Sequence, residues 1–199
     1  MKETVIYVHG KGGSADEAEH YKLLFPDAHV VGFDYKAQNP REAMIEFPAY
    51  FDKKREDCDS ITLIANSIGA FFSMHTLSEK NVNKALFISP IVNMEKLILD
   101  MMIWAHVTEN DLCAQREIPT DFGEVLSWDY LCYVRKNPIL WRVPTRILYG
   151  EKDNLTSMDT ITEFADSIGA PITVMKGGEH WFHTEEQMTF LDNWILGQI

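Results

Sequence analysis

The chain has 199 residues, 46% of them hydrophobic, and a formal net charge of −12. This length suits one globular domain with a full core. The acidic balance argues against a nucleic-acid partner, which needs a basic patch, and against binding to an anionic membrane surface. We interpret the acidity as an aid to solubility.

The cysteines and the first residues favour a reducing compartment. Three cysteines without C-x-x-C spacing indicate free thiols rather than a disulfide framework. Residues 1–4 lead directly into an apolar run, without the charged and long apolar regions of a signal peptide. No run approaches the roughly 18 apolar residues of a membrane span. We therefore expect a soluble, cytoplasmic protein.

In chain order, six short apolar runs alternate with helical patterns. Such runs, rich in β-branched residues, are typical of parallel strands covered on both faces. We predict strands at Val5–Val8, Val30–Phe33, Ile61–Ala65, Ala85–Ile88, Thr145–Tyr149 and Ile172–Met175. Capping signals predict helix starts at Ser14, Asn39, Thr156 or Ser157, and Thr184. This alternation predicts an α/β fold with a doubly wound, mostly parallel sheet of about six strands.

One connection, residues 91–143, is too long for a simple crossover. It carries helical patterns over Met94–His106 and Gly123–Arg135. We interpret it as a helical cap inserted into a single domain that spans residues 1–199. The alternative is two ordinary crossover helices joined by a long loop.

A serine stands where a predicted strand turns into a helix. Small residues, Ala65 and Gly69, lie two positions before and after Ser67. They would let strand and helix approach each other at a sharp, strained turn, and the helix N-terminus favours a nearby anion. Ser67 is therefore a candidate nucleophile. The alternative is a serine that only caps the helix.

Two further polar residues follow later strands. Asp153 comes after the strand that ends at Gly150, where a carboxylate can orient a histidine. Glu151 is the rival acid, and a helix-capping role for Asp153 is the alternative. His180 follows a glycine pair after the last strand and could reach the serine.

His183 is close enough to be confused with His180, but we expect it to belong to the start of the next helix. A metal site at the two histidines lacks a third ligand, so no metal and no cofactor are expected.

The first strand ends in the sequence HGKGGS. This turn lacks the lysine–serine pair of a phosphate loop and the full G-x-G-x-x-G spacing. It can instead aim the backbone N–H of Lys11 toward Ser67. With the N–H of Ile68 this would form a two-donor oxyanion hole, with Gly12 as the runner-up donor. We expect His9 to brace the loop.

The order His-Gly, Ser67, Asp153, His180, each after a predicted strand, resembles the α/β-hydrolase superfamily over nearly the whole chain. The chain departs from the family at Ala65, where glycine is usual, and it begins at what resembles the family's third strand. The resemblance implies a compact serine hydrolase with Ser67, Asp153 and His180 as its triad. It also implies a cap inserted after the strand that ends at Ser89.

The resemblance and the site residues lead to one expected activity. We expect an esterase-like serine hydrolase that cleaves a carboxylic ester or thioester of a small, fairly apolar molecule through an acyl-enzyme. Candidate substrate contacts are Trp104, Trp128 and Trp181. Two alternatives stay open: a carbon–carbon bond hydrolase or lyase on the same triad, and a non-enzymatic protein that binds a small molecule.

Overall fold

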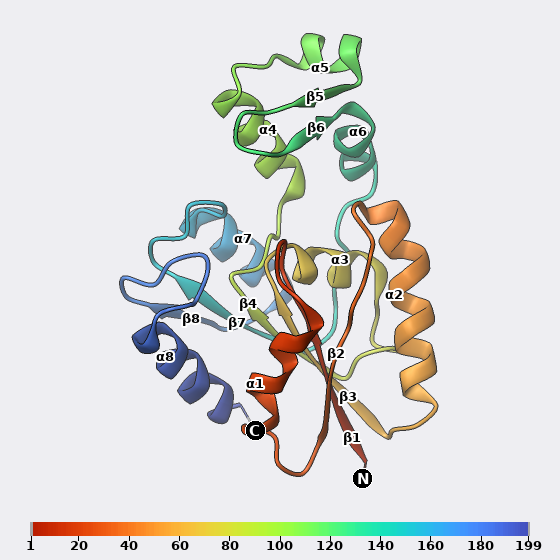
Figure 1. Ribbon diagram of the computed structural model, residues 1–199, viewed down its shortest axis with the longest axis vertical. Helices are drawn as coiled ribbons and strands as arrows, with labels where there is room; N and C mark the ends of the chain where they lie inside the picture. Colours follow the sequence, from red (N-terminus) through yellow and green to blue (C-terminus); the bar gives the residue numbers. More distant parts are fainter. Residues whose placement is uncertain (1, 199) are drawn as a thin grey trace. The chain divides into compact units, whose positions relative to one another are not determined.

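A computed structural model describes residues 2–198 of the chain. Its centre is a six-stranded sheet in the order β2-β1-β3-β4-β7-β8, in which every neighbouring pair is parallel (Figure 1). The strands are β1 (Glu3–Val8), β2 (His29–Gly32), β3 (Ser60–Asn66), β4 (Lys84–Ile88), β7 (Thr145–Gly150) and β8 (Ile172–Met175). Each predicted strand coincides with one of these, so the predicted doubly wound sheet is confirmed.

Helices cover both faces of this sheet. On one face lie α1 (Ala18–Lys22), which follows a short 3₁₀ turn η1 (Ala15–Glu17), and α8 (Glu185–Leu196). On the other lie α2 (Pro40–Arg55), α3 (Ile68–Thr76) and α7 (Met158–Ile168) (Figure 1). The two-sided cover explains why β1 and β3 each have five consecutive buried residues, most of them apolar, since both faces of each strand are buried.

The core differs between the two faces. Under α1 and α8, side chains of all six strands meet a cluster that includes Tyr21, Leu191, Trp194 and Ile195. Under α2 and α3 the packing is aromatic, and the rings of Phe33 and Phe47 lie 4.9 Å apart in an edge-on contact. Burial of large rings makes both layers strong contributors to the hydrophobic core.

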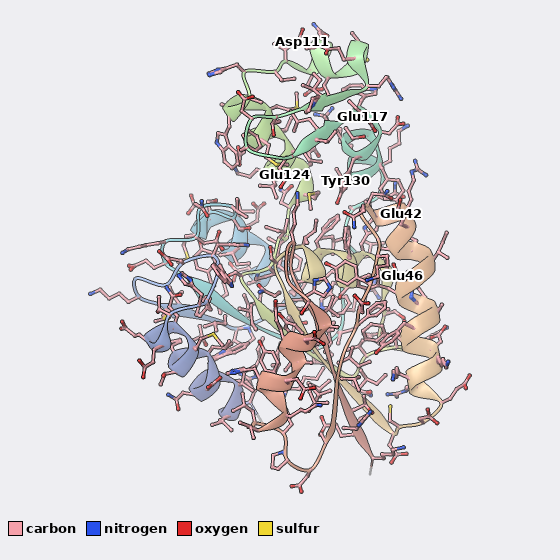
Figure 2. All side chains as sticks on the ribbon, in the orientation of Figure 1. Glu42, Glu46, Asp111, Glu117, Glu124 and Tyr130 are labelled. Atoms are coloured by element: carbon pink, nitrogen blue, oxygen red, sulfur yellow. The ribbon has the colours of Figure 1, made fainter. Side chains whose placement is uncertain are left out.

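The start of α2 shows how the sequence fixes a helix boundary. Asn39 caps the helix by accepting from two backbone N–H groups, and Pro40 occupies the first helical position. Glu42 and Glu46 project from α2 (Figure 2) and accept backbone N–H groups of the preceding segment at Gln38 and Ala37, at 2.7 and 2.8 Å. These carboxylates hold the chain that leads from β2 into the helix.

A second compact unit, Asn93–Ile139, interrupts the first, which comprises the chain up to Val92 and from Leu140 onward. Its elements are α4 (Met94–Trp104), α5 (Glu109–Gln115), β5 (Glu117–Pro119), β6 (Val125–Ser127) and α6 (Trp128–Lys136). The Arg135 guanidinium joins three of its helices, because it donates to Glu95 at 2.7 Å and binds both carboxylate oxygens of Glu109 at 2.8 Å.

This unit is not wholly helical, in contrast to the expectation from the sequence. β5 and β6 form an antiparallel pair, so the predicted helix over 123–135 is wrong in its first part. The physical reason is a turn: Gly123 has a φ of +83°, and the Thr120 N–H and hydroxyl both donate to the Glu124 carbonyl. The helix begins only at Trp128, after the Ser127 cap.

The helices are all short compared with a bilayer. The longest described helix, α2, has 16 residues, and between residues 2 and 198 no helix is both long and apolar enough to cross a membrane.

Candidate active site

Ser67 lies at the junction of β3 and α3, on a strained backbone. Its φ is +52° and its ψ −122°, a conformation that residues other than glycine rarely adopt. The sharp turn is possible because Gly69 has no side chain: an added Cβ would lie 2.3 Å from the carbonyl oxygen of His9. Ala65 is fully buried on the other side of the turn. The two small residues therefore let α3 start directly against the end of β1.

Asp153 lies in the loop after β7, and its carboxylate is held on three sides. One oxygen, Oδ1, accepts the backbone N–H groups of Leu155 and Thr156 at 2.8 and 3.0 Å. The other, Oδ2, lies 2.7 Å from Nδ1 of His180, and the Asp153 side chain has no exposed surface. An ionised carboxylate only accepts hydrogen bonds, so the shared proton sits on Nδ1 of the histidine.

His180 bridges the acid and the serine. Its second ring nitrogen, Nε2, lies 2.8 Å from Oγ of Ser67, and with Nδ1 as the donor to Asp153 it is free to accept the serine hydroxyl proton. These three residues come from positions 67, 153 and 180, and the structure brings them into one hydrogen-bonded chain. The parallel sheet makes this possible because the carboxyl ends of β3, β7 and β8 share one edge.

Glycines let the acid loop and the histidine loop cross closely. A Cβ added to Gly150 would lie 2.4 Å from the carbonyl oxygen of Glu179, and the Lys152 N–H donates to the Gly178 carbonyl at 2.7 Å. The glycine pair before His180 is recognisable in the sequence, whereas this role of Gly150 was not predicted. The position of Gly150 directly between a strand and a polar loop is the signal that could have found it.

The two rival residues have other partners. Glu151, the alternative acid, accepts the backbone N–H of Gly177 at 2.7 Å and so supports the histidine loop from outside the hydrogen-bonded chain. His183 bonds through Nδ1 to the carbonyl of Trp181 at 2.8 Å and lies just before the Thr184 cap of α8. Neither side chain is hydrogen-bonded to Ser67, Asp153 or His180 among residues 2–198.

The loop after β1 lies beside Ser67. A Cβ added to Gly10 would be 3.1 Å from Cβ of Ser67, and Gly12 has a φ of +75° in the turn closed by the Gly13 N–H and the Gly10 carbonyl. His9 braces this loop, because its ring stacks on Tyr35 and the Tyr35 hydroxyl donates to the His9 carbonyl at 3.0 Å. Ile68 begins α3, and the N–H groups of a first helical turn have no intrahelical acceptor.

Tyr149 is buried near Asp153, and this environment changes its pKa. Desolvation first, and the Asp153 charge second, raise the pKa of Tyr149 to about 12. The protonated hydroxyl donates to the Thr156 carbonyl at 2.7 Å, next to the N–H that binds Asp153. The tyrosine therefore stiffens the loop that carries the carboxylate.

The three candidate tryptophans lie in different places. Trp181 follows His180, is 66% exposed and stacks on His183 with the ring centroids 4.4 Å apart. Trp104 ends α4 and packs edge-on against Phe122, whereas Trp128 begins α6. Both of these belong to the second unit.

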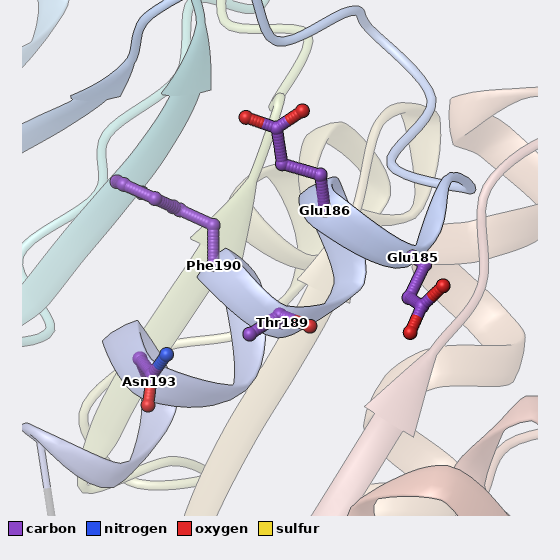
Figure 3. A pocket seen from close by; sticks show the side chains of 5 residues that line it. All are labelled: Glu185, Glu186, Thr189, Phe190 and Asn193. Carbon is purple, nitrogen blue, oxygen red and sulfur yellow. The ribbon is translucent and has the colours of Figure 1, made fainter.

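The first unit also carries an open hollow. It is lined by side chains of α8 alone: Glu185, Glu186, Thr189, Phe190 and Asn193 (Figure 3). None of the five belongs to the hydrogen-bonded chain of Ser67, His180 and Asp153.

A parallel sheet covered by helices on both faces, with a serine at a sharp strand-to-helix turn, is typical of the α/β-hydrolase fold. This protein has that fold. Est1E from Butyrivibrio proteoclasticus is similar at a TM-score of 0.76 with 12% identity, covering 99% of this chain and 86% of that one. Mouse alpha/beta hydrolase domain-containing protein 10 matches at 0.76 with 14% identity, covering 98% and 88%. A monoacylglycerol lipase of Paleococcus ferrophilus matches at 0.64 with 15% identity, covering 98% and 95%.

The sequence comparisons are sparser. No protein-family model matches the chain. A Mycoplasma genitalium protein named "Putative esterase/lipase 3" is 29% identical in an alignment of 103 positions, and the match covers 45% of this chain and 37% of that protein. The match thus spans little more than a third of the length of that relative.

Proposed function

We propose that the protein is a serine hydrolase that cleaves a carboxylic ester or thioester of a small, fairly apolar molecule. The observation that carries this proposal is the pair of hydrogen bonds that links Ser67 Oγ to His180 Nε2 at 2.8 Å and His180 Nδ1 to Asp153 Oδ2 at 2.7 Å. The names of the esterase and lipase proteins that it resembles support the same reaction class.

In this mechanism Ser67 is the nucleophile. Its Oγ attacks the carbonyl carbon of the substrate while Nε2 of His180 takes the hydroxyl proton. The Asp153 carboxylate stays ionised, holds the imidazole by Nδ1 and stabilises the imidazolium that forms. The tetrahedral intermediate then collapses, His180 donates its proton to the leaving group, and an acyl group remains on Ser67.

Water completes the cycle. His180 takes a proton from a water molecule, which attacks the acyl carbonyl, and the proton returns to Ser67 as the acid product leaves. In both steps the backbone N–H groups of Ile68 and Lys11 stabilise the oxyanion, with Gly12 as the second choice for the loop donor. The strained turn at Ser67, with its φ of +52°, supports the role of nucleophile, because such strand-to-helix turns expose a serine hydroxyl at the end of the sheet.

The preference for an apolar substrate rests on Trp181. This ring is exposed and directly follows His180, so it can form an apolar wall beside the scissile bond. Trp104 and Trp128 are proposed as further substrate contacts, and residues 91–143, which contain the second unit, as the family's inserted cap.

The replacement Ser67→Ala tests the proposal. Hydrolysis of p-nitrophenyl esters, tried over rising acyl-chain length, should fall at least about 10³-fold, since the residual rate comes from binding and the oxyanion hole alone. A fluorophosphonate probe should label the wild-type protein once and leave Ser67→Ala unlabelled. Ser167→Ala, at an exposed serine on α7, is the matched control and should keep full activity.

The same experiment separates the alternatives. Full ester hydrolysis by Ser67→Ala would end the proposal. Labelling without hydrolysis of any ester would favour carbon–carbon bond cleavage or a lyase reaction on the same triad. A folded wild-type protein that neither reacts with the probe nor hydrolyses an ester would be a binding protein.

A further inference from the structure

The carboxylate of Glu17 holds the loop that follows β1. Glu17 ends the η1 turn, and its Oε1 accepts the backbone N–H of Ser14 at 3.1 Å. Its second oxygen, Oε2, accepts the hydroxyl of Tyr7. Both carboxylate oxygens are thus engaged, one by the loop and one by the sheet.

Tyr7 is a buried anchor for this carboxylate. It lies on β1 and is 2% exposed. Burial above all, then the nearby Tyr21 and Glu17, raises the pKa of Tyr7 far above its ordinary value. The phenol therefore stays protonated and remains a donor to Glu17 throughout the range in which enzymes work.

Contacts continue from Glu17 to the serine. A Cβ added to Gly13 would lie 2.7 Å from Oε1 of Glu17, so the loop backbone rests directly on the carboxylate. Gly13 closes a turn on Gly10, whose own Cβ position is 3.1 Å from Cβ of Ser67. The chain of contacts runs from Tyr7 through Glu17 and the glycine turn to the nucleophile.

We propose that Glu17, held by Tyr7, is a positioning residue that fixes the loop of residues 10–14. The fixed loop keeps its oxyanion donor, the backbone N–H of Lys11 in the proposed mechanism, pointed at the oxyanion. This inference rests on the proposed function of the site. Glu17 touches no reacting atom and acts only through the loop. Its effect belongs to the transition state, because the oxyanion forms only there.

An amide replaces this carboxylate only in part. Ser14 and Tyr7 each donate to a separate oxygen of Glu17, whereas glutamine offers one acceptor oxygen and an NH₂ group that only donates. In Glu17→Gln the Tyr7 hydroxyl must therefore turn round to accept from the amide, and both hydrogen bonds lose the strength that the charge of the carboxylate gives them. Tyr7→Phe breaks only the bond to the sheet and leaves the bond between Glu17 and Ser14 in place, which separates positioning from helix capping.

The test compares Glu17→Gln and Tyr7→Phe with two matched controls. Glu19→Gln removes the same charge two residues away, where the carboxylate pairs with Lys22 at the surface. Tyr21→Phe removes a buried hydroxyl from the ring that packs 5.0 Å from Tyr7. Each protein is assayed for kcat and KM with p-nitrophenyl acetate and for inhibition by phenylboronic acid, which forms a tetrahedral adduct with an active serine. Thermal unfolding checks the fold.

We expect kcat to fall about 10- to 100-fold in Glu17→Gln and Tyr7→Phe, less than the loss of a whole oxyanion donor. KM should change less than about twofold, and the affinity for phenylboronic acid should fall in parallel with kcat. Glu19→Gln and Tyr21→Phe should stay within about twofold of wild type in every measurement.

Three results would overturn the inference. One is unchanged kcat in a folded Tyr7→Phe or Glu17→Gln protein. Another is an equal loss in Tyr21→Phe or Glu19→Gln, which would mean a general effect on packing or charge. The third is a wild-type rate no faster than that of Ser67→Ala, which would remove the proposed function itself and is recognisable because all variants would then be equally inactive.

Discussion

Two carboxylates follow β7 closely, Glu151 and Asp153, and they bind different groups. Asp153 has no exposed side-chain surface and accepts from His180 and two backbone N–H groups. Glu151, two residues earlier, is exposed and accepts from Gly177. Asp153, three residues after the strand, reaches His180. Glu151, directly after the strand, reaches the backbone of the loop at Gly177.

Asp153→Asn should therefore cost far more activity than Glu151→Gln. An asparagine can donate to Nδ1 of His180 and favour the wrong tautomer, so kcat should fall about 10³- to 10⁴-fold. In Glu151→Gln the amide oxygen of the new side chain can still accept from Gly177, so kcat should stay within about threefold. Steady-state kinetics on a p-nitrophenyl ester measures both, and circular dichroism verifies folding. Equal losses of kcat in the two variants would mean that the assignment of Asp153 as the catalytic acid is wrong.

At the scale of elements, strands were easier to predict from the sequence than the inserted segment. A strand buried on both faces shows a continuous, mostly apolar run, such as the buried residues Ile61–Ala65 of β3, and such a run has few other interpretations. β5 and β6 have three residues each, too few for a period to show, and helix α6 follows β6 without a loop. Leu126 belongs to β6 but also fits the helical spacing of the apolar residues in α6. The predicted helix therefore extended wrongly into the hairpin.

The candidate site was predictable for a related reason. Ser67, Asp153 and His180 each follow a predicted strand, and parallel strands bring their carboxyl ends to one edge. The supporting groups could not be predicted in this way. Glu151 and Tyr7 act through contacts with other segments of the chain, and nothing in their local pattern identifies those contacts.

The packing of α3 against the end of β1 gives a prediction for Gly69. In Gly69→Ala the added Cβ would meet the backbone oxygen of His9 at 2.3 Å, and a backbone atom cannot move aside as a flexible side chain can. The free energy of unfolding in urea should drop by about 1–3 kcal/mol.

Gly197→Ala is the matched control. At this helix end the nearest atoms to an added Cβ are 3.5 Å away and φ is −72°, so stability should change by less than about 0.5 kcal/mol. A Gly69→Ala protein as stable as wild type would show that helix and strand can separate without cost.

At the scale of the whole molecule, the core contains tyrosines that can ionise in alkali, and these do not contribute to the net charge counted at pH 7. Tyr7, Tyr21 and Tyr35 are buried on the two faces of the sheet, and desolvation is the largest cause that raises the pKa of each. The negative charges of nearby acids add to this effect, namely Glu17 for all three rings, Asp192 for Tyr21 and Glu46 for Tyr35. Folding therefore favours the protonated phenol at all three positions.

Stability should consequently fall in alkali. The unfolded chain loses phenol protons near the ordinary tyrosine pKa of about 10, whereas the folded chain keeps them to higher pH. Above this pH the unfolded state binds fewer protons, so the free energy of unfolding decreases by up to about 1.4 kcal/mol per pH unit for each such tyrosine. Their contribution is fully present below pH ~10 and is lost as the pH rises through the folded-state values.

Urea unfolding of wild type and Tyr21→Phe at pH 8.5 and pH 11 measures this effect. Tyr21→Phe removes one of the three titrating rings, so its loss of stability between the two pH values should be smaller than that of wild type by about 1 kcal/mol. The comparison at pH 8.5 corrects for packing changes, because the phenols are protonated in both states there. An identical loss in both proteins would mean that Tyr21 ionises as readily in the folded core as in the unfolded chain, and that burial in this layer does not hold its proton.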